Sequence, residues 1–71
     1  MISKLTLEML RREYMPGTRV RLISMNDPFT HLPAGTEGSV IAVDDIGTIH
    51  IAWDCGNSLG AVYGEDKVVI I

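Results

Sequence analysis

The pattern of apolar residues changes at Pro16-Gly17, and this change limits the chain to one helix followed by a small sheet. Before it, apolar residues recur at helical spacing; after it, short segments alternate apolar and polar residues between turns that contain glycine or proline. Proline cannot continue a helix, and glycine adopts the turn conformations that follow one. We therefore expect an N-terminal helix within residues 1–15, with Ser3 or Thr6 as its N-cap, and a β domain over residues 18–71.

Five short strands are expected in the β domain, over residues 18–25, 37–43, 48–54, 58–63 and 68–71. The third alternates most clearly, with Ile49, Ile51 and Trp53 on one face. Gly38 in the second strand indicates a bulge or a bend. Because closing so small a sheet removes most of its exposed edge, this order predicts a mainly β fold. The expected architecture is a small five-stranded SH3-like barrel with an N-terminal α-helix over one open face.

The length of 71 residues supports a single domain over residues 1–71, which buries only about 60% of its unfolded surface. The hydrophobic content of 46% excludes disorder caused by low hydrophobicity. No apolar run approaches the roughly 20 residues of a membrane span, and the first residues lack a signal-peptide pattern. We therefore expect a cytoplasmic protein with no membrane partner. A zinc site would need Cys55, His31 and His50 without the usual paired spacing, so neither a metal nor a cofactor is expected.

The net charge of −3 conceals an asymmetry along the chain. Residues 1–25 carry five basic and two acidic side chains (+3), whereas residues 26–71 carry one basic and seven acidic side chains (−6). Either the two halves lie side by side and neutralise each other, or they present a bipolar surface that favours self-association or a bipolar partner. The balance disfavours duplex nucleic acid, which requires a continuous basic face.

The expected helix carries its apolar side chains in two stripes. The stripes are Ile2/Leu5/Met9 and Leu7/Leu10/Tyr14. At about 100° per residue they lie more than a quarter-turn apart, and a helix on a small domain docks through one stripe. The second stripe is therefore either wrapped by the domain or offered to another molecule. If Leu5 and Met9 are free, Lys4, Arg11 and Arg12 give this exposed patch a basic rim.

Neighbouring carboxylates and a histidine are the candidates for chemistry. Asp44-Asp45 has the composition of an acid–base or metal site, but also that of a turn in which an aspartate bonds its own backbone before a glycine. Asp54 has the same two interpretations at the next hairpin. His50 and Cys55 lack the third group that nucleophilic catalysis needs. We therefore expect turns rather than catalytic sites, and no enzyme activity.

Trp53 is the strongest single pointer to a binding surface, because tryptophan is enriched at interaction hot spots. It also shares a strand face with Ile49 and Ile51, which favours a place in the core. Phe29 in the long loop and Tyr63 at a strand end would supply further rings to an aromatic groove. We expect Trp53 in the core and keep the groove as the alternative.

Five ordered segments carry a family resemblance. They are residues 16–20 (PGTRV), 22–28 (LISMNDP), 32–40 (LPAGTEGSV), 43–50 (VDDIGTIH) and 53–59 (WDCGNSL). In this order they resemble the short bacterial proteins of the DUF4314 family, a domain of unknown function. The resemblance implies an SH3-like barrel and a setting in phages, plasmids and conjugative elements of Gram-positive bacteria, and it implies no activity. Cys55 departs from the small polar residue expected at its turn.

Three functions follow as hypotheses. The first is a non-catalytic interaction module that binds a protein partner or itself. The alternatives are an anti-defence protein that occupies a host immunity factor or sequesters a nucleotide signal, and a nucleic-acid-associated accessory protein with Arg11, Arg12, Arg19 and Arg21 as its basic patch. We expect partner binding at the following residues: Leu5, Met9, Arg11, Arg12, Phe29, Asp44, Asp45, Trp53 and Asp54.

Overall fold

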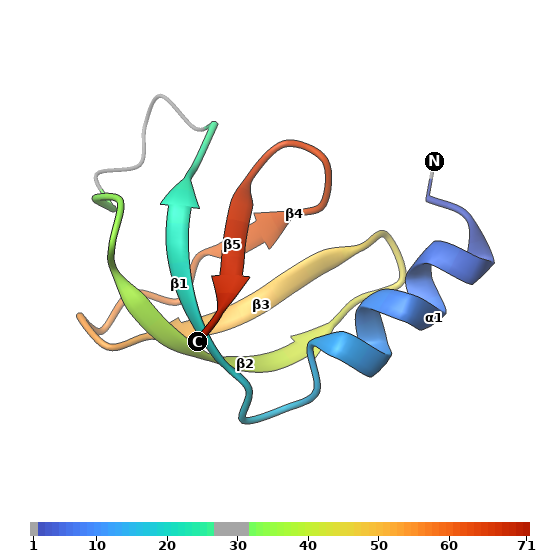
Figure 1. The fold of residues 1–71 in the computed structure, drawn as a ribbon, viewed down its shortest axis with the longest axis horizontal. Coiled ribbons are helices and arrows are strands. Elements are labelled where there is room, and N and C mark those ends of the chain that lie inside the picture. The colour runs from blue at the N-terminus through green and yellow to red at the C-terminus, as the bar shows by residue number, and fades with distance from the viewer. Residues whose placement is uncertain (1, 27–31) are drawn as a thin grey trace.

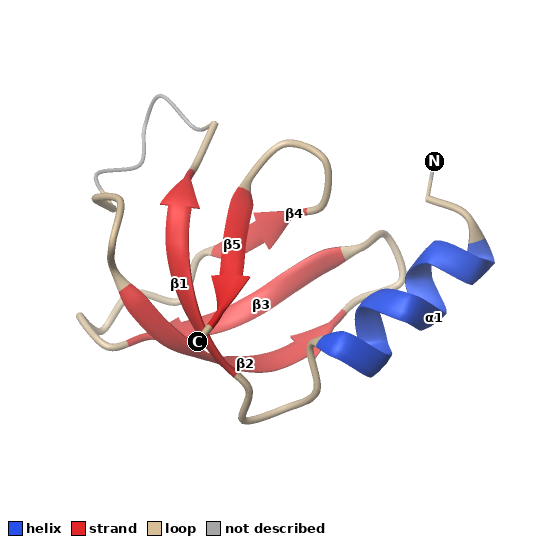
Figure 2. Cartoon of the chain, in the orientation of Figure 1, coloured by secondary structure: helices blue, strands red, loops and turns tan. Residues whose placement is uncertain are grey.

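The computed structural model describes residues 2–26 and 32–71, which form one helix and five strands (Figure 1). The elements are α1 (Lys4–Glu13), β1 (Arg19–Ser24), β2 (Glu37–Val43), β3 (Thr48–Trp53), β4 (Gly60–Val62) and β5 (Lys67–Ile70). All five expected strands are present, with ends that differ from the prediction by at most two residues. The helix comes first and all strands follow it (Figure 2). The predicted mainly β class with an N-terminal helix is confirmed.

The strands form a single antiparallel sheet in the order β4-β3-β2-β1-β5. β1 to β4 each pair with their neighbours in the chain, and β5 returns to pair with β1. Among the described residues, β4 and β5 contact each other without a ladder, and only an isolated bridge joins Tyr63 to Asp66. Since the sheet stays open between these two strands, the predicted closure into an SH3-like barrel is not confirmed.

The core lies on the inner face of the sheet, where alternate residues of each strand meet. In β1, Val20 and Leu22 are buried while Arg21 between them is exposed. The buried core side chains are Leu10, Val20, Leu22, Val40, Val43, Ile49, Ile51, Trp53 and Ala61. The predicted two-residue alternation is thus confirmed in β1 and in β3, whose Ile49/Ile51/Trp53 face is the buried one.

α1 packs across one end of the sheet, against β2 (Figure 1). The Ser3 side chain caps its N-terminus, as the sequence predicts for one of two candidates. Within α1, which is described in full, Leu10 alone is buried. Arg11 donates through Nε to the Val43 carbonyl oxygen at 3.3 Å and through Nη2 to Asp45 Oδ1 at 2.6 Å. One apolar side chain and one arginine therefore attach the helix to the end of β2.

Gly38 and the bulge of β2 lie at different positions. The register between β2 and β3 shifts between Val40 and Ala42, so the extra residue is Ile41. Gly38 itself sits in regular pairing, and a Cβ there would lie 2.9 Å from the Trp53 Cα. Glycine is therefore needed because two backbones approach closely, and the bulge expected at Gly38 lies instead at Ile41.

Candidate functional site

A groove lies between α1 and the connection from β4 to β5, on the side where the sheet is open. It consists of two hollows of about 210 and about 520 Å³, and both are lined by Tyr63 and Gly64. We call the two hollows together the Tyr63 groove. Of the expected partner-binding residues that the structure describes, none lines either hollow.

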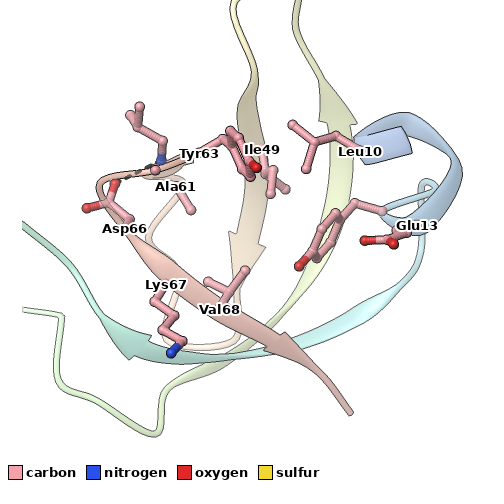
Figure 3. A pocket seen from close by; sticks show the side chains of 11 residues that line it. Leu10, Glu13, Ile49, Ala61, Tyr63, Asp66, Lys67 and Val68 are labelled. Atoms are coloured by element: carbon pink, nitrogen blue, oxygen red, sulfur yellow. Dashed lines mark hydrogen bonds between the residues drawn. The ribbon is translucent and has the colours of Figure 1, made fainter. Parts of the chain in front are cut away.

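The smaller hollow has an apolar floor (Figure 3). Leu10 of α1, Ile49 of β3 and Val68 of β5 line it, although they lie far apart in the sequence. Tyr14 also lines it, and burial, followed by the carboxylate of Glu13, raises the pKa of the Tyr14 phenol. A tyrosine phenol is protonated at neutral pH even at its ordinary pKa, so Tyr14 can donate a hydrogen bond beside an apolar floor. Such a hollow suits an apolar side chain of a bound molecule that has, next to it, a polar group able to accept this hydrogen bond.

The larger hollow lies between the start of α1 and two turns. Ile46, at the tip of the β2–β3 turn, is 76% exposed, and Tyr63 is 54% exposed. Ile2 lines the same hollow and packs against Gly47, where a Cβ would lie 2.7 Å from the Ile2 Cδ1. Two large side chains with apolar surface thus face solvent from the walls of one groove.

Asp44 holds the β2–β3 turn and therefore the position of Ile46. Its Oδ1 accepts hydrogen bonds from the backbone N–H groups of Ile46 at 3.1 Å and Thr48 at 2.9 Å, and Gly47 has a φ of 85°. These contacts confirm the predicted turn chemistry. Asp44 Oδ2 also lies 2.9 Å from His50 Nε2, a pair that the sequence does not predict. The Thr48 N–H, followed by the His50 side chain, lowers the pKa of Asp44.

The structure distinguishes the two apolar stripes of the helix. The docked stripe is Leu7/Leu10/Tyr14, which is buried or packed against the core. Leu5 is 69% exposed and Met9 is also exposed, so these two residues form the free stripe. Ile2 does not belong to it, because it precedes α1 and packs against the core.

The free stripe adjoins the Tyr63 groove. Three residues along a helix correspond to a rotation of about 300°, so Met9 lies about 60° around the axis from Thr6. Thr6 lines the larger hollow. Leu5 and Met9 therefore extend the exposed apolar surface from the groove onto the outer side of α1.

Ion pairs join the basic N-terminal part of the chain to the acidic remainder. Among the described residues, the pairs are Arg11–Asp45, Arg19–Asp54, Arg19–Glu37 and Arg21–Glu37. The Arg19 guanidinium bonds both oxygens of Asp54, at 2.8 and 2.6 Å, and lowers the pKa of that carboxyl. Neutralisation between the two halves, one of the two expected arrangements, is therefore observed. Asp44, Asp45 and Asp54 all bond groups of their own chain.

The remaining expected partner-binding residues are Trp53, Arg12 and Phe29, and the first two differ in their exposure to solvent. Trp53 lies in the core, where its indole N–H donates to the Leu59 carbonyl oxygen at 2.9 Å. The predicted place of Trp53 in the core is thus confirmed, because the face that it shares with Ile49 is the buried face of β3. Arg12 is exposed on α1, and Phe29 lies outside the described residues.

Ile46 is the groove residue that the sequence analysis missed. The turn prediction for residues 44–47 treats all four positions as turn chemistry, yet a large apolar residue between aspartate and glycine is unusual there. The isoleucine in this turn was therefore the sequence feature that could have indicated an exposed binding residue. Tyr63 was expected only as a further ring for an aromatic groove, and in the structure it lines the smaller hollow, as Tyr14 does.

The described residues contain no group of three or more His, Cys, Asp or Glu side chains that could hold a metal ion. No helix in this part of the chain has the length and apolar character needed to cross a membrane. A family model described as domain of unknown function (DUF4314) matches residues 3–71, so the resemblance of the five segments extends over nearly the whole chain. No curated protein matches the sequence.

Proposed function

Because the chain belongs to the DUF4314 family, a domain of unknown function, we propose a function from its surface. In this proposal, the protein acts as a non-catalytic interaction module that binds a protein partner in the Tyr63 groove. The proposal rests on one observation: Ile46 and Tyr63 are both more than half exposed on the walls of a groove with an apolar floor. Exposed apolar surface gathered at one place in a small soluble domain marks an interaction site.

The groove has the chemistry of a protein-binding surface. Tyrosine is enriched among residues that dominate binding energy, and Tyr63 lines both hollows. Leu10 and Val68 offer an apolar floor to one inserted side chain of the partner. Leu5 and Met9 then lie beside the bound partner and enlarge the apolar contact.

The ion pairs within the chain disfavour the two alternative functions. Arg11, Arg19 and Arg21 of the hypothetical basic patch each bond a carboxylate of the same chain, which leaves less free positive charge for phosphates. Asp45 and Asp54 are engaged in two of these pairs, so they offer less free negative charge to a host immunity factor. We place this module in the cytoplasm of cells that carry a phage, plasmid or conjugative element, from the family resemblance and the free Cys55 thiol.

Affinity capture with matched variants tests the proposal. Tagged wild-type protein, Tyr63→Ala, Ile46→Ser and the control Ile41→Ser are each incubated with lysate of cells that carry the protein. Ile41 is an exposed isoleucine on β2 that lines neither hollow, so its substitution matches that of Ile46. Far-UV circular dichroism establishes that all four proteins are folded.

We expect one or a few proteins to be retained by the wild type and by Ile41→Ser. Their recovery falls about tenfold or more with Tyr63→Ala and Ile46→Ser, as for residues that dominate an interface. Equal recovery with all four baits would place binding elsewhere. Enrichment of nucleic acid without protein would instead support the accessory-protein alternative.

A further inference from the structure

The outer edge of β5 presents backbone groups to the gap between β5 and β4. The Ile71 N–H donates to a carbonyl oxygen of β1 at 3.0 Å, and two residues earlier Val69 pairs with Arg21 of β1. In an antiparallel ladder only every second residue bonds a given neighbour. The N–H and C=O groups of Val68 and Ile70 therefore point away from β1, toward the open side of the sheet.

The opposite edge of the sheet, on β4, is covered at Val62 by the chain itself. The Val62 N–H donates to Asp66 Oδ2 at 2.8 Å, and the Val62 carbonyl oxygen accepts from the Asp66 N–H at 2.9 Å. Asp66 Oδ1 also accepts from the Asn26 N–H at 2.7 Å, which holds this carboxylate in place. In the part of the chain that the structure describes, nothing covers Val68 and Ile70 in this way. The β4 edge is thus protected at Val62, whereas both outward-facing residues of β5 are available for pairing.

The side chains at the free edge are apolar and incompletely covered. Val68 pairs with Leu22 and Ile70 pairs with Val20, so both β5 residues face the same side of the sheet as the core. Ile70 is nevertheless 50% exposed. Lys67, the only charged residue of β5, points to the opposite side of the strand from Val68 (Figure 3). The apolar side chains on the core side of β5 are therefore left partly exposed to solvent.

We propose that β5 pairs antiparallel with β5 of a second copy of this chain, around a two-fold axis at Val69. In this register Val68 of each copy lies opposite Ile70 of the other, and both residues exchange their free N–H and C=O groups. The two inner faces then form a continuous row of valine and isoleucine. The pairing goes beyond the proposed function, because it uses the backbone edge of β5. Val68 also lines the smaller hollow of the Tyr63 groove, but Ile70 lines neither hollow, so variants at Ile70 test the pairing separately from the groove.

Charge and symmetry favour a second copy as the occupant. Four residues separate the two Lys67 positions along the paired strands, about 13 Å at about 3.3 Å per residue. This distance exceeds the screening length of about 8 Å at physiological salt, so the two ammonium groups do not repel each other appreciably. Each free N–H group of Val68 and Ile70 then meets a free C=O group of the other copy, and each free C=O group meets an N–H group. Two-fold pairing of this sort is the commonest form of self-association.

Sedimentation equilibrium of the full chain, with lysine variants of matched exposure, tests the pairing. Ile70→Lys places a charge at the free edge on the core side, which opposes strand addition. Ile41→Lys introduces the same charge at a residue that is 52% exposed on β2, and serves as control. We expect dimers for the wild type and Ile41→Lys, and at least about tenfold weaker association for Ile70→Lys, because each substitution acts twice in a two-fold dimer.

A backbone variant and a measurement on the wild type make the test independent of side-chain effects. Ile70→Pro removes an N–H that points away from β1, so it should weaken the dimer while the β1–β5 ladder remains. In the wild type, amide hydrogen exchange at Val68 and Ile70 should slow as concentration rises from micromolar to millimolar. A monomer at millimolar concentration, or exchange at these two amides that does not depend on concentration, overturns the proposal. So does a dimer that survives both Ile70 substitutions, even if Leu5→Ser then dissociates it.

Discussion

Replacing Leu10 by alanine should detach α1 from the sheet, because Leu10 is the helix residue that enters the core. Leu10 is 5% exposed, whereas Leu5 on the same helix is 69% exposed, so Leu5→Ala is a matched control. The substitution removes three carbons, and at about 0.8 kcal/mol for each buried carbon the transfer term is about 2.4 kcal/mol. Because Leu10 lines a hollow of about 210 Å³, little further cost arises from a new cavity.

We therefore expect Leu10→Ala to lower the free energy of unfolding by about 2–3 kcal/mol, and Leu5→Ala by less than about 0.5 kcal/mol. The free energy of unfolding of a domain of this length is about 4–11 kcal/mol in total, so the loss is a large fraction of its stability. A helix of ten residues is too short to persist undocked.

Urea unfolding followed by two probes measures this loss. Far-UV circular dichroism reports α1, and fluorescence of Trp53 reports the core of the sheet. In Leu10→Ala the helical signal should be lost at lower urea than the Trp53 signal, whereas the two transitions coincide in the wild type and in Leu5→Ala. Equal stability of the two variants would refute the assignment of Leu10 as the docking residue.

Three further predictions concern the sheet. Trp53→Ala should cost about 3–5 kcal/mol by chemical unfolding, and native Trp53 should emit at shorter wavelength than solvated tryptophan. Gly38→Ala should cost about 1–3 kcal/mol or more, since its Cβ would meet the backbone at Trp53; a melting temperature equal to that of the wild type would contradict this. The folded-state pKa of Asp44 is lowered, so its stabilisation is present above the unfolded pKa of about 3.9 and is lost as pH falls through the folded value. Thermal melts of Asp44→Asn should therefore differ from those of the wild type at pH 7 and converge with them in acid.

Local rules account for the parts of the fold that the sequence predicts. The Ser3 cap, the turn at Asp44 and the alternation of Val20 with Leu22 each depend on residues within one element. In these cases spacing and side-chain chemistry are sufficient, because the partners are a few positions apart. The five strands follow from the same rules, which is why their ends are nearly correct.

The groove could not be predicted, because it depends on the angle at which α1 meets the sheet. Both stripes of the helix have similar composition, and only the position of β2 decides that Leu10 is buried and Leu5 is free. Ile46 and Tyr63 are 17 positions apart, and nothing local indicates that they line one hollow. The Arg11–Asp45 pair likewise joins residues whose proximity follows only from helix docking.

The strand order has a consequence for synthesis of the protein on the ribosome. β2, β3 and β4 are neighbours both in the chain and in the sheet, so their hairpins can form as soon as they emerge. β1 emerges before them but keeps one side open until residues 67–70 arrive to pair with it. A nascent chain therefore carries β1 with one side unpaired until residues 67–70 have emerged. A transcript truncated before β5 should yield a product that chaperones and proteases recognise, whatever the state of its hairpins.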